Sequence, residues 1–281
     1  MNIGIGLPIG DPPVLLDWAR RADAGPFSTL GLLDRLVFHN PEPLVALAVL
    51  AGATSRVRVQ TEVLLAPLRE PALLAKQAAT LDQMTGGRLT LGLGVGGRHD
   101  DHQVAGVDMH TRGRRLDEQM AVMRRIWSGK PYGQDAGPIG PAPARPGGPP
   151  VLFGGFRPAA LERVARWGDG FLAAAPPTWA GDLFDTVRAF WKQYDRAGRP
   201  HIVAQVNIAL GPQDVIDDAR ANMHAYYAFT GMADQMVSGM LTTPAQIRET
   251  ITAFTDLGAD EVVFYCYGLD PSQVDRLAEV V

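Results

Sequence analysis

The sequence predicts an α/β fold, a single-domain (β/α)8 TIM barrel that covers residues 1–281. Eight short apolar runs alternate with helical patterns along the whole chain. The runs are mostly apolar throughout, which is typical of parallel strands covered by helices. A chain of 281 residues with 46% hydrophobic content is long enough for one such barrel. An open doubly wound sheet is the alternative, because strand counts from one sequence can err by one or two elements.

The first half of the chain is predicted to supply four strands and four helices. Asn40 is expected to cap the second helix, with Pro41 at its first position. The fourth helix carries one apolar side, which we interpret as core or dimer interface, made of Leu116, Met120, Met123 and Trp127. The strands are expected at Asn2–Leu7, Thr29–Leu33, Val57–Leu65 and Leu89–Leu93, and the helices over Pro12–Ala24, from Pro41, over Glu70–Met84 and over Arg112–Trp127.

The second half begins with a Pro/Gly-rich segment, "GPIGPAPARPGGPP" at 137–150. Its six prolines lack the amide donor that helices and central strands need, so it predicts an extended surface connector. The strand–helix rhythm resumes after it, which favours a long loop inside one domain over a domain linker. Strands are expected at Val151–Phe153, Gly170–Ala173, Ile202–Leu210 and 261–267, and helices over Pro158–Trp167, Trp179–Ala197, 212–230, 243–258 and 271–280.

Composition and charge exclude several classes of function. The net charge of −4 and the lack of a long basic run argue against nucleic acid or an anionic membrane surface as partner. The single cysteine, Cys266, excludes an internal disulfide and fits a reducing compartment. The first ten residues have no basic region of a secretory signal, and no apolar run approaches a membrane span. We therefore expect a soluble cytoplasmic protein that acts on a small molecule.

A glycine motif follows the fourth predicted strand in "RLTLGLGVGGRHDDHQ", residues 88 to 103. Gly92-x-Gly94-x-x-Gly97 has the spacing of a dinucleotide-binding fingerprint. That fingerprint needs a helix to begin at the glycines, whereas here the next clear helical pattern starts near Arg112. In a barrel, the active site lies at the carboxyl ends of the strands. There, residues without a Cβ let a flat ligand approach the backbone, and a simple tight turn is the alternative.

Longer stretches of the chain resemble the luciferase-like flavin-dependent oxidoreductases, the superfamily of bacterial luciferase and of the enzymes that use the deazaflavin coenzyme F420. The matching stretches are "LLAKQAATLDQMTGGRLTLGLGVGGR" (73–98), "GVDMHTRGRRLDEQMAVMRRIW" (106–127), "GGFRPAALERVARWGDGF" (154–171) and "LGADEVVFYCYGLDPSQVDRLAEVV" (257–281). This resemblance implies a barrel with a flavin at its mouth, and often a homodimer.

The resemblance places Asp34 and Arg35 at the end of the second strand, close to the flavin ring. Relatives often have an acidic residue followed by His there, and Arg35 replaces that His. Arginine stays protonated, so it can hold an anion or a carbonyl group but cannot shuttle a proton. Asp34 is a candidate base or orienting group, and the alternative is an ion pair with Arg35 or a helix cap.

Glu62 and Val63 end the third strand, where several deazaflavin-binding relatives have a non-proline cis peptide that bulges behind the ring. Glu62 departs from the small residue usual there. It either faces the site, where a carboxylate needs a hydrogen-bond partner or a proton, or forms a salt bridge at the rim. The backbone of Gly94, Val95, Gly96 and Gly97 is expected to lie along the flavin.

The loop Gly154, Gly155, Phe156 and Arg157 is a candidate phosphate site for the cofactor, because it precedes a helix whose first residue is Pro158. Free amides at a helix start attract anions, and an arginine adds a charged donor. The alternative is an arginine that is merely solvated on the loop.

His99-Asp100-Asp101-His102 has the residue types of a metal site. Consecutive loop residues rarely converge on one ion, so we predict no metal. We expect a polar lid over the substrate instead, with His99 as a donor to it.

These residues predict a flavin-dependent oxidoreductase, with Asp34, Arg35, Glu62 and His99 as catalytic candidates. The leading hypothesis is a monooxygenase using reduced FMN and oxygen, with a separate flavin reductase as a candidate partner. The alternatives are hydride transfer with F420, a non-catalytic flavin-binding relative, and an unrelated barrel enzyme with a phosphorylated substrate. The missing His and the lack of a lysine after the sixth strand favour FMN, whereas the Ala/Arg/Gly-rich composition, which resembles that of high-GC soil bacteria, favours F420.

Overall fold

The computed structural model describes residues 1–10 and 12–281, and its strands form one closed parallel barrel. The sheet order runs β3-β2-β1-β9-β8-β7-β6-β5-β4, and β3 also pairs with β5, which joins the two ends of the sheet. Every strand pair is parallel. The strands are β1 (Asn2–Gly6), β2 (Thr29–Leu32), β3 (Arg58–Thr61), β4 (Leu64–Leu65), β5 (Leu89–Gly94), β6 (Val151–Gly154), β7 (Gly170–Ala173), β8 (His201–Ile208) and β9 (Glu261–Cys266).

The third barrel strand is divided into two pieces. The prediction of one strand over Val57–Leu65 is therefore nearly right, because β3 and β4 both pair with β5 along it. The peptide between Glu62 and Val63, which separates the pieces, is cis, as the resemblance implies. Counting β3 and β4 together gives the eight predicted strands and confirms the (β/α)8 barrel.

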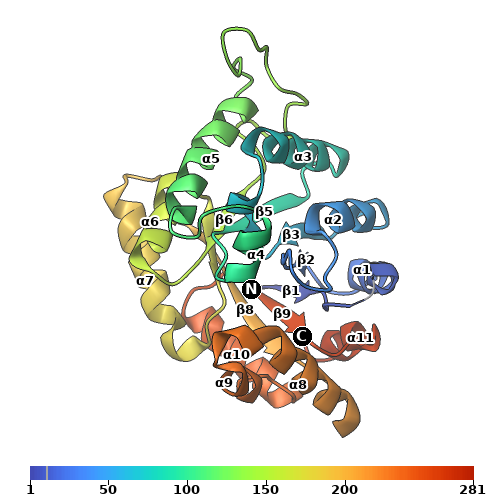
Figure 1. The fold of residues 1–281 in the computed structure, drawn as a ribbon. Coiled ribbons are helices and arrows are strands. Elements are labelled where there is room, and N and C mark those ends of the chain that lie inside the picture. The colour runs from blue at the N-terminus through green and yellow to red at the C-terminus, as the bar shows by residue number, and fades with distance from the viewer. Residues whose placement is uncertain (11) are drawn as a thin grey trace.

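Helices surround the strands on all sides of the barrel (Figure 1). The α-helices are α1 (Leu15–Ala24), α2 (Pro43–Gly52), α3 (Pro71–Met84), α4 (His99–Val104), α5 (Arg112–Trp127), α6 (Pro158–Trp167), α7 (Pro177–Gln193), α8 (Gln213–Tyr227), α9 (Ala233–Ser238), α10 (Pro244–Asp256) and α11 (Ser272–Ala278). Three short 3-10 helices are η1 (Pro12–Val14), η2 (Ala66–Leu68) and η3 (Ala228–Thr230).

Three predictions about helices were wrong in detail. The second helix starts at Pro43, because the Glu42 carboxylate caps it by accepting from Val45 N at 2.8 Å, whereas the Asn40 amide donates to the carbonyls of Arg35 and Pro41. The polar run after the glycines is not a loop but helix α4, which starts at His99. Acidic residues in its first turn favour this helix, since they face the positive end of the helix dipole. Helix α9 was not predicted.

The core lies between the strands and the inner faces of the helices. The apolar side of α5 is buried within this one chain, with Leu116, Met120 and Met123 at 1% exposure or less and Trp127 at 4%. Trp127 also donates its indole N–H to the carbonyl of Ala75 on α3, at 2.9 Å. Of the two interpretations of this stripe, the core interpretation is therefore correct. Among the described residues, the structure has no helix of the length and apolar character that a membrane span requires.

The Pro/Gly-rich segment joins α5 to β6 and projects from the barrel as a long loop (Figure 1). It is fastened at a few points only. Lys76 of α3 donates to the Gly140 carbonyl at 2.6 Å, and Arg145 donates to the Gly87 carbonyl at 2.8 Å. Because Gly87 precedes β5, the segment is fastened at the pole formed by the amino ends of the strands.

Candidate active site

The carboxyl end of β2 bears two of the predicted residues, but they do not pair with each other. Asp34 accepts from Arg69 Nη1 at 2.6 Å and from the amide of Leu65 at 2.8 Å. Its side chain is 4% exposed, so it has a buried cationic partner and ties β2 to β4. The alternative that Asp34 pairs with Arg35 is wrong, because Arg69, the residue that follows η2, pairs with Asp34.

Arg35 pairs instead with Asp101, which comes from α4. Arg35 Nε donates to Asp101 Oδ2 at 3.2 Å, and the two side chains are 4% and 1% exposed. The other oxygen of Asp101 accepts from the amides of Leu36 and Val37 at 3.0 and 2.7 Å. This buried ion pair anchors α4 to the chain that follows β2.

Aromatic rings surround the Arg35 guanidinium. Its Cζ lies 4.7 Å from the ring centroid of Phe38, 5.3 Å from that of Tyr226 and 5.7 Å from that of Phe229. Tyr226 also contacts Tyr227 and Tyr267 edge-on or tilted. We call Arg35 with the rings of Phe38, Tyr226 and Phe229 the arginine cage. It joins the end of β2 to α8 and η3, and cation–π contacts favour this arrangement.

Glu62 faces the inside of the barrel, as one of the two interpretations expected. It accepts hydrogen bonds from the side-chain amides of Gln60 and Gln205, and within the described residues it forms no salt bridge. Burial raises the pKa of Glu62 to about 8, although the two amide donors and Tyr265 lower it. Gly31 makes room for this group, because a Cβ there would lie 2.8 Å from Glu62 Cδ.

Val63, the next residue, forms a small raised surface between two glycines. A Cβ added at Gly94 would lie 2.3 Å from Val63 Cγ2, and one added at Gly154 would lie 3.0 Å from Val63 Cγ1. The tips of β5 and β6 therefore leave room for the Val63 side chain because they end in glycine. We call Val63 with Gly94 and Gly154 the glycine platform. Because neither glycine carries a side chain, a planar ring such as that of a flavin or deazaflavin can lie against this surface.

The glycines after β5 run outward from this platform. Gly94 is buried, Val95 and Gly96 are half-buried and Gly97 is exposed. His102 lies under this turn, with its Nε2 at 3.1 Å from the Val95 carbonyl. Helix α4 follows the glycines directly, contrary to the prediction, yet the closed barrel excludes the open dinucleotide-binding fold.

The predicted phosphate loop lies at the tip of β6. Gly154 and Gly155 are half-buried, whereas Phe156 and Arg157 are exposed. Phe156 packs edge-on against Trp179, with the ring centroids 5.5 Å apart. Arg157 caps α6 and has no side-chain hydrogen bond or ion pair to any described residue. The loop is therefore open to an anion, and equally to water.

His99 is exposed at the start of α4 and forms no hydrogen bond within the described residues. Asp100 pairs with Arg98 at 2.6 Å, and Asp101 is engaged by Arg35. Within the described residues, no group of three or more His, Cys, Asp or Glu side chains could hold a metal ion. The cluster is thus spread over the faces of a helix, where its members have different partners.

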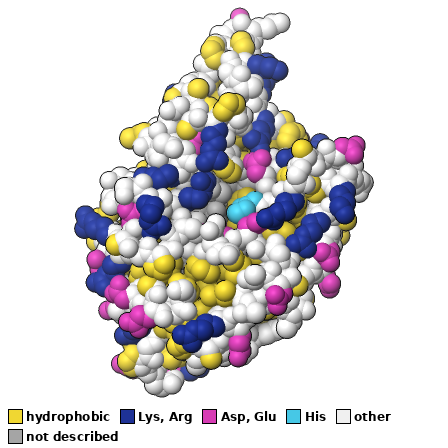
Figure 2. All heavy atoms as spheres, turned by 180° about the vertical axis from the view of Figure 1, so that it is seen from behind, with side chains coloured by type: hydrophobic (Ala, Val, Ile, Leu, Met, Phe, Trp, Pro, Cys, Tyr) yellow, Lys and Arg dark blue, Asp and Glu magenta, His cyan; other side chains and the backbone are white. Residues whose placement is uncertain are grey.

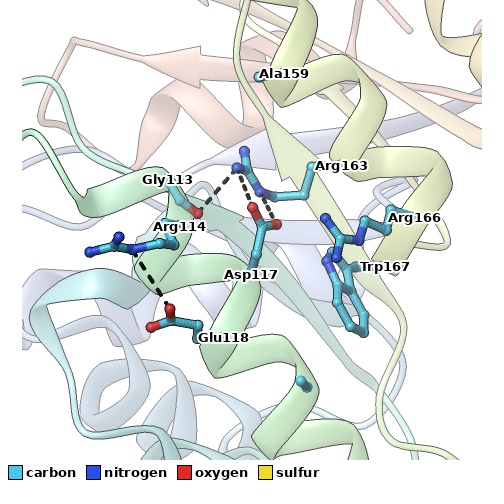
Figure 3. A pocket seen from close by; sticks show the side chains of 9 residues that line it. Gly113, Arg114, Asp117, Glu118, Ala159, Arg163, Arg166 and Trp167 are labelled. Carbon is cyan, nitrogen blue, oxygen red and sulfur yellow. Dashed lines mark hydrogen bonds and ion pairs between the residues drawn. The ribbon is translucent and has the colours of Figure 1, made fainter.

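Two cavities lie away from the predicted residues. One of about 590 Å³ runs between α5 and α6, where Arg163 reaches Asp117 and the carbonyl of Gly113 (Figure 3). The other, of about 350 Å³, lies at the amino ends of the strands and is lined by residues including Arg58, His201 and Glu261. Figure 2 shows a hollow near the middle of one face, with histidine, acidic and basic side chains around it. We place the active site at the pole formed by the carboxyl ends of the strands, because barrel enzymes bind substrate there.

Several residues near the candidate site were not singled out from the sequence, among them Gln205, Tyr226, Phe229 and Tyr265. Gln205 and Tyr265 come from strands that were read only as apolar runs. Tyr226 and Phe229 lie at the end of α8 and in η3. The adjacent aromatic residues of "AYYAFT" were the available signal, since aromatic side chains with a polar tip are common in binding sites.

The parallel barrel agrees with the comparison to known proteins. A sequence model of the family described as luciferase-like monooxygenase matches residues 6–255. The chain belongs to this family. The family includes oxidoreductases and monooxygenases that use flavin or F420, and the predicted membership of the luciferase-like superfamily is confirmed.

Individual relatives share limited sequence identity with this chain. An uncharacterized protein of Mycobacterium tuberculosis is 37% identical over 138 residues, which cover 47% of each chain. The chain thus spans about half the length of the mycobacterial relatives of this type. An F420-dependent glucose-6-phosphate dehydrogenase of Kineococcus radiotolerans is 25% identical over 272 residues, covering 84% of this chain and 80% of the relative.

Among solved structures, an F420-dependent secondary alcohol dehydrogenase in complex with an F420–acetone adduct aligns with a TM-score of 0.84. The alignment covers 100% of this chain and 98% of the other, at 19% identity. At this identity the likeness confirms the barrel fold and carries nothing about the substrate.

Proposed function

We propose that this protein is an oxidoreductase that binds the tricyclic ring of coenzyme F420 on the glycine platform and transfers a hydride between it and a small organic substrate. The observation that carries the proposal is the platform itself. Val63 occupies the space that glycine leaves at the tips of β5 and β6, so a Cβ at Gly94 would displace it and one at Gly154 would crowd it. The half-buried backbone of Val95 and Gly96 continues this surface outward.

F420 is preferred over FMN because of the relatives. The relative from Kineococcus that matches most of the chain carries F420 dependence in its name, as does the structure that aligns at a TM-score of 0.84. In the sequence analysis, the absence of a His after Asp34 favours FMN as the cofactor. That argument loses force in the structure, because Asp34 and Arg35 are both tied into buried ion pairs.

When bound, reduced F420 supplies the hydride. The residues of this chain position the reactants and exclude water. Glu62 lies inside the barrel and can hold a proton at a carboxyl oxygen below about pH 8, the value to which burial raises its pKa. Gln60 and Gln205 fix the direction of this carboxyl group. Arg35 acts as a fixed donor, since a guanidinium does not release its proton near neutral pH.

The loop of Gly155, Phe156 and Arg157 is proposed to hold the cofactor phosphate. Arg157 has no side-chain partner within the described residues, and it lies at the amino end of α6, where the helix dipole favours an anion. Replacing Arg157 with Ala should weaken F420 binding about tenfold, which corresponds to the loss of one charged contact. Wild-type affinity in this variant would remove the loop from the proposal.

Titration of the purified protein with F420 and with FMN, followed by cofactor fluorescence, tests the proposal. We expect saturable binding of F420 and weaker binding of FMN. Binding of FMN alone, with substrate-dependent oxygen uptake, would support the second candidate, an FMN-dependent monooxygenase. The description of the family as luciferase-like monooxygenase favours that candidate. Binding without turnover would indicate a non-catalytic relative, and no binding of either cofactor would refute the proposal.

We further propose that the protein forms a homodimer through the outer faces of α2 and α3, which lie side by side in Figure 1. Val45 and Val49 of α2 are 65% and 56% exposed, and Leu73 and Met84 of α3 are 56% and 83% exposed. Exposed apolar residues that gather on one surface mark a protein interface more often than scattered ones do.

The second candidate function, an FMN-dependent monooxygenase, would also need a separate flavin reductase as a partner.

A further inference from the structure

We propose that the cavity at the amino ends of the strands is a second binding site, which takes a phosphate group carried by the free ion or by a small phosphomonoester. The cavity has a volume of about 350 Å³, and the residues that line it include Arg58 and Arg145. We call these two residues the arginine pair. The site lies at the other end of the barrel from the glycine platform, so the proposal does not depend on which cofactor the platform binds.

The arginine pair is fastened to the first residues of β5. Arg58, at the start of β3, donates Nε to Thr90 Oγ1 at 3.2 Å and Nη2 to the Leu89 carbonyl at 3.3 Å. Arg145, in the Pro/Gly-rich segment, donates Nη2 to the Gly87 carbonyl at 2.8 Å. Because these carbonyls are nearly adjacent in the chain, the two guanidinium groups lie close together. Nη1 of each arginine makes no hydrogen bond to a described residue, so each group keeps a donor for a ligand.

The carboxylates that line the cavity are engaged by other groups. Glu261 accepts from the hydroxyl of Ser28. Asp169 accepts from the amide of Val151 at 2.8 Å and pairs with Arg124 at 3.3 Å. Among the described residues, no salt bridge joins a carboxylate to either member of the arginine pair. The pair therefore faces the cavity without an anionic partner in direct contact.

The two positive charges act on each other. Burial first, and then the charge of Arg145, lower the pKa of the Arg58 guanidinium, whereas Glu261 and Asp82 raise it. An anion bound between two like charges removes their repulsion. The planar fork of a guanidinium matches phosphate oxygens, and a phosphate group has enough oxygens for two forks, whereas a carboxylate fills one. The arginine pair therefore favours a phosphate group over a carboxylate.

Neutral groups around the arginine pair also fit this ligand. Thr29 lines the cavity, and its hydroxyl is buried without a hydrogen-bond partner among the described residues. A buried hydroxyl without a partner is unfavourable, so a ligand oxygen that reaches it gains stability. His201 lines the same cavity with a side chain that is 43% exposed, so the site is open to solvent on this side. The volume is that of a small ligand site, which suits a phosphate with a short organic body.

Isothermal titration calorimetry of the purified protein with inorganic phosphate, glycerol 3-phosphate and acetate, at equal ionic strength, tests this proposal. We expect at least one of the two phosphates to bind with a Kd below about 1 mM, and acetate to bind at least threefold more weakly. Tighter binding of glycerol 3-phosphate than of inorganic phosphate identifies a phosphomonoester as the ligand, and the reverse order or equal binding identifies the free ion. A Kd above about 1 mM for both phosphates, or acetate bound less than threefold more weakly, would overturn the proposal.

Variants decide where the phosphate binds. Arg145→Met removes one guanidinium from an exposed loop residue, so phosphate affinity should fall about tenfold. Arg114→Met is the matched control, since Arg114 is 74% exposed on α5 and pairs with Glu118 there, and its affinity should match that of the wild type. Arg157→Ala should also keep the affinity, because Arg157 lies at the other pole. Affinity lost in Arg157→Ala and kept in Arg145→Met would place the ion at the carboxyl ends of the strands and refute the proposal.

A second substitution covers the case in which Arg145→Met does not fold by circular dichroism. Arg145→Lys keeps the charge and the long stem but removes the fork, so phosphate affinity should fall about threefold or more. Unchanged affinity in whichever of these two variants folds would refute the arginine pair as the binding group.

Discussion

Glu62 should make the stability of this protein depend on pH in a defined window. Burial raises the pKa of its carboxyl group from 4.5 to about 8 in the folded chain. Between these values the folded state holds a proton that the unfolded state has released. The free energy of unfolding therefore falls as the pH rises from about 4.5 to 8, by roughly 1.4 kcal/mol per pH unit and roughly 5 kcal/mol in all.

Glu62→Gln removes the titration, since its amide is neutral throughout and keeps a similar shape. The melting temperature of the wild type should fall relative to this variant as the pH rises from about 5.5 to 8. A difference of roughly 3 kcal/mol over that range corresponds to about 6–12 °C for a domain of this size. Scanning calorimetry or circular dichroism at several pH values measures it.

The control for this prediction is Glu249→Gln, because Glu249 is exposed on α10 and makes no side-chain hydrogen bond within the described residues. Its melting curve should follow that of the wild type at every pH. If the difference between Glu62→Gln and the wild type is the same at low and high pH, then Glu62 is not a buried titrating group and the reasoning fails.

Three further predictions concern packing and assembly. Gly31→Ala should destabilise by about 1–3 kcal/mol in urea unfolding, because its Cβ would lie 2.8 Å from Glu62 Cδ; a neutral effect would place Glu62 elsewhere. Arg69→Met should cost about 2–4 kcal/mol, because it leaves the Asp34 carboxylate, 4% exposed, without its cation; a loss below about 1 kcal/mol would contradict a buried pair. Val45→Asp should convert a dimer to a folded monomer in sedimentation; a wild-type monomer at micromolar concentration would contradict the interface.

Much of the barrel could be predicted because its signals are local. Runs such as Val57–Leu65 and the helix 112–127 carry their periodicity within one segment, and Thr243 with Gln246 forms a capping box where the helix predicted over 243–258 begins. The start of α2 was placed two residues early, since Asn40 and Glu42 both precede a proline and both can cap a helix. Only the folded geometry decides which side chain reaches the free amides.

The partners within the site could not be predicted, because they come from distant parts of the chain. Asp34 meets Arg69, 35 residues later, and Arg35 meets Asp101, 66 residues later. The inward direction of Glu62 depends on the room that Gly31 leaves on the neighbouring strand. Side-chain alternation along a strand is interrupted between β3 and β4, so the sequence pattern alone left both directions open for Glu62.

The Pro/Gly-rich excursion between α5 and β6 has a practical use. Residues 131–138, in the connection between α5 and β6, are all exposed, and the chain enters and leaves this connection at the pole formed by the amino ends of the strands. Loop tips of this kind tolerate inserted sequence better than the elements they connect. An affinity tag, a fluorescent reporter or a surface tether placed there would leave the carboxyl ends of the strands unobstructed, so immobilised protein could be used directly in the titrations.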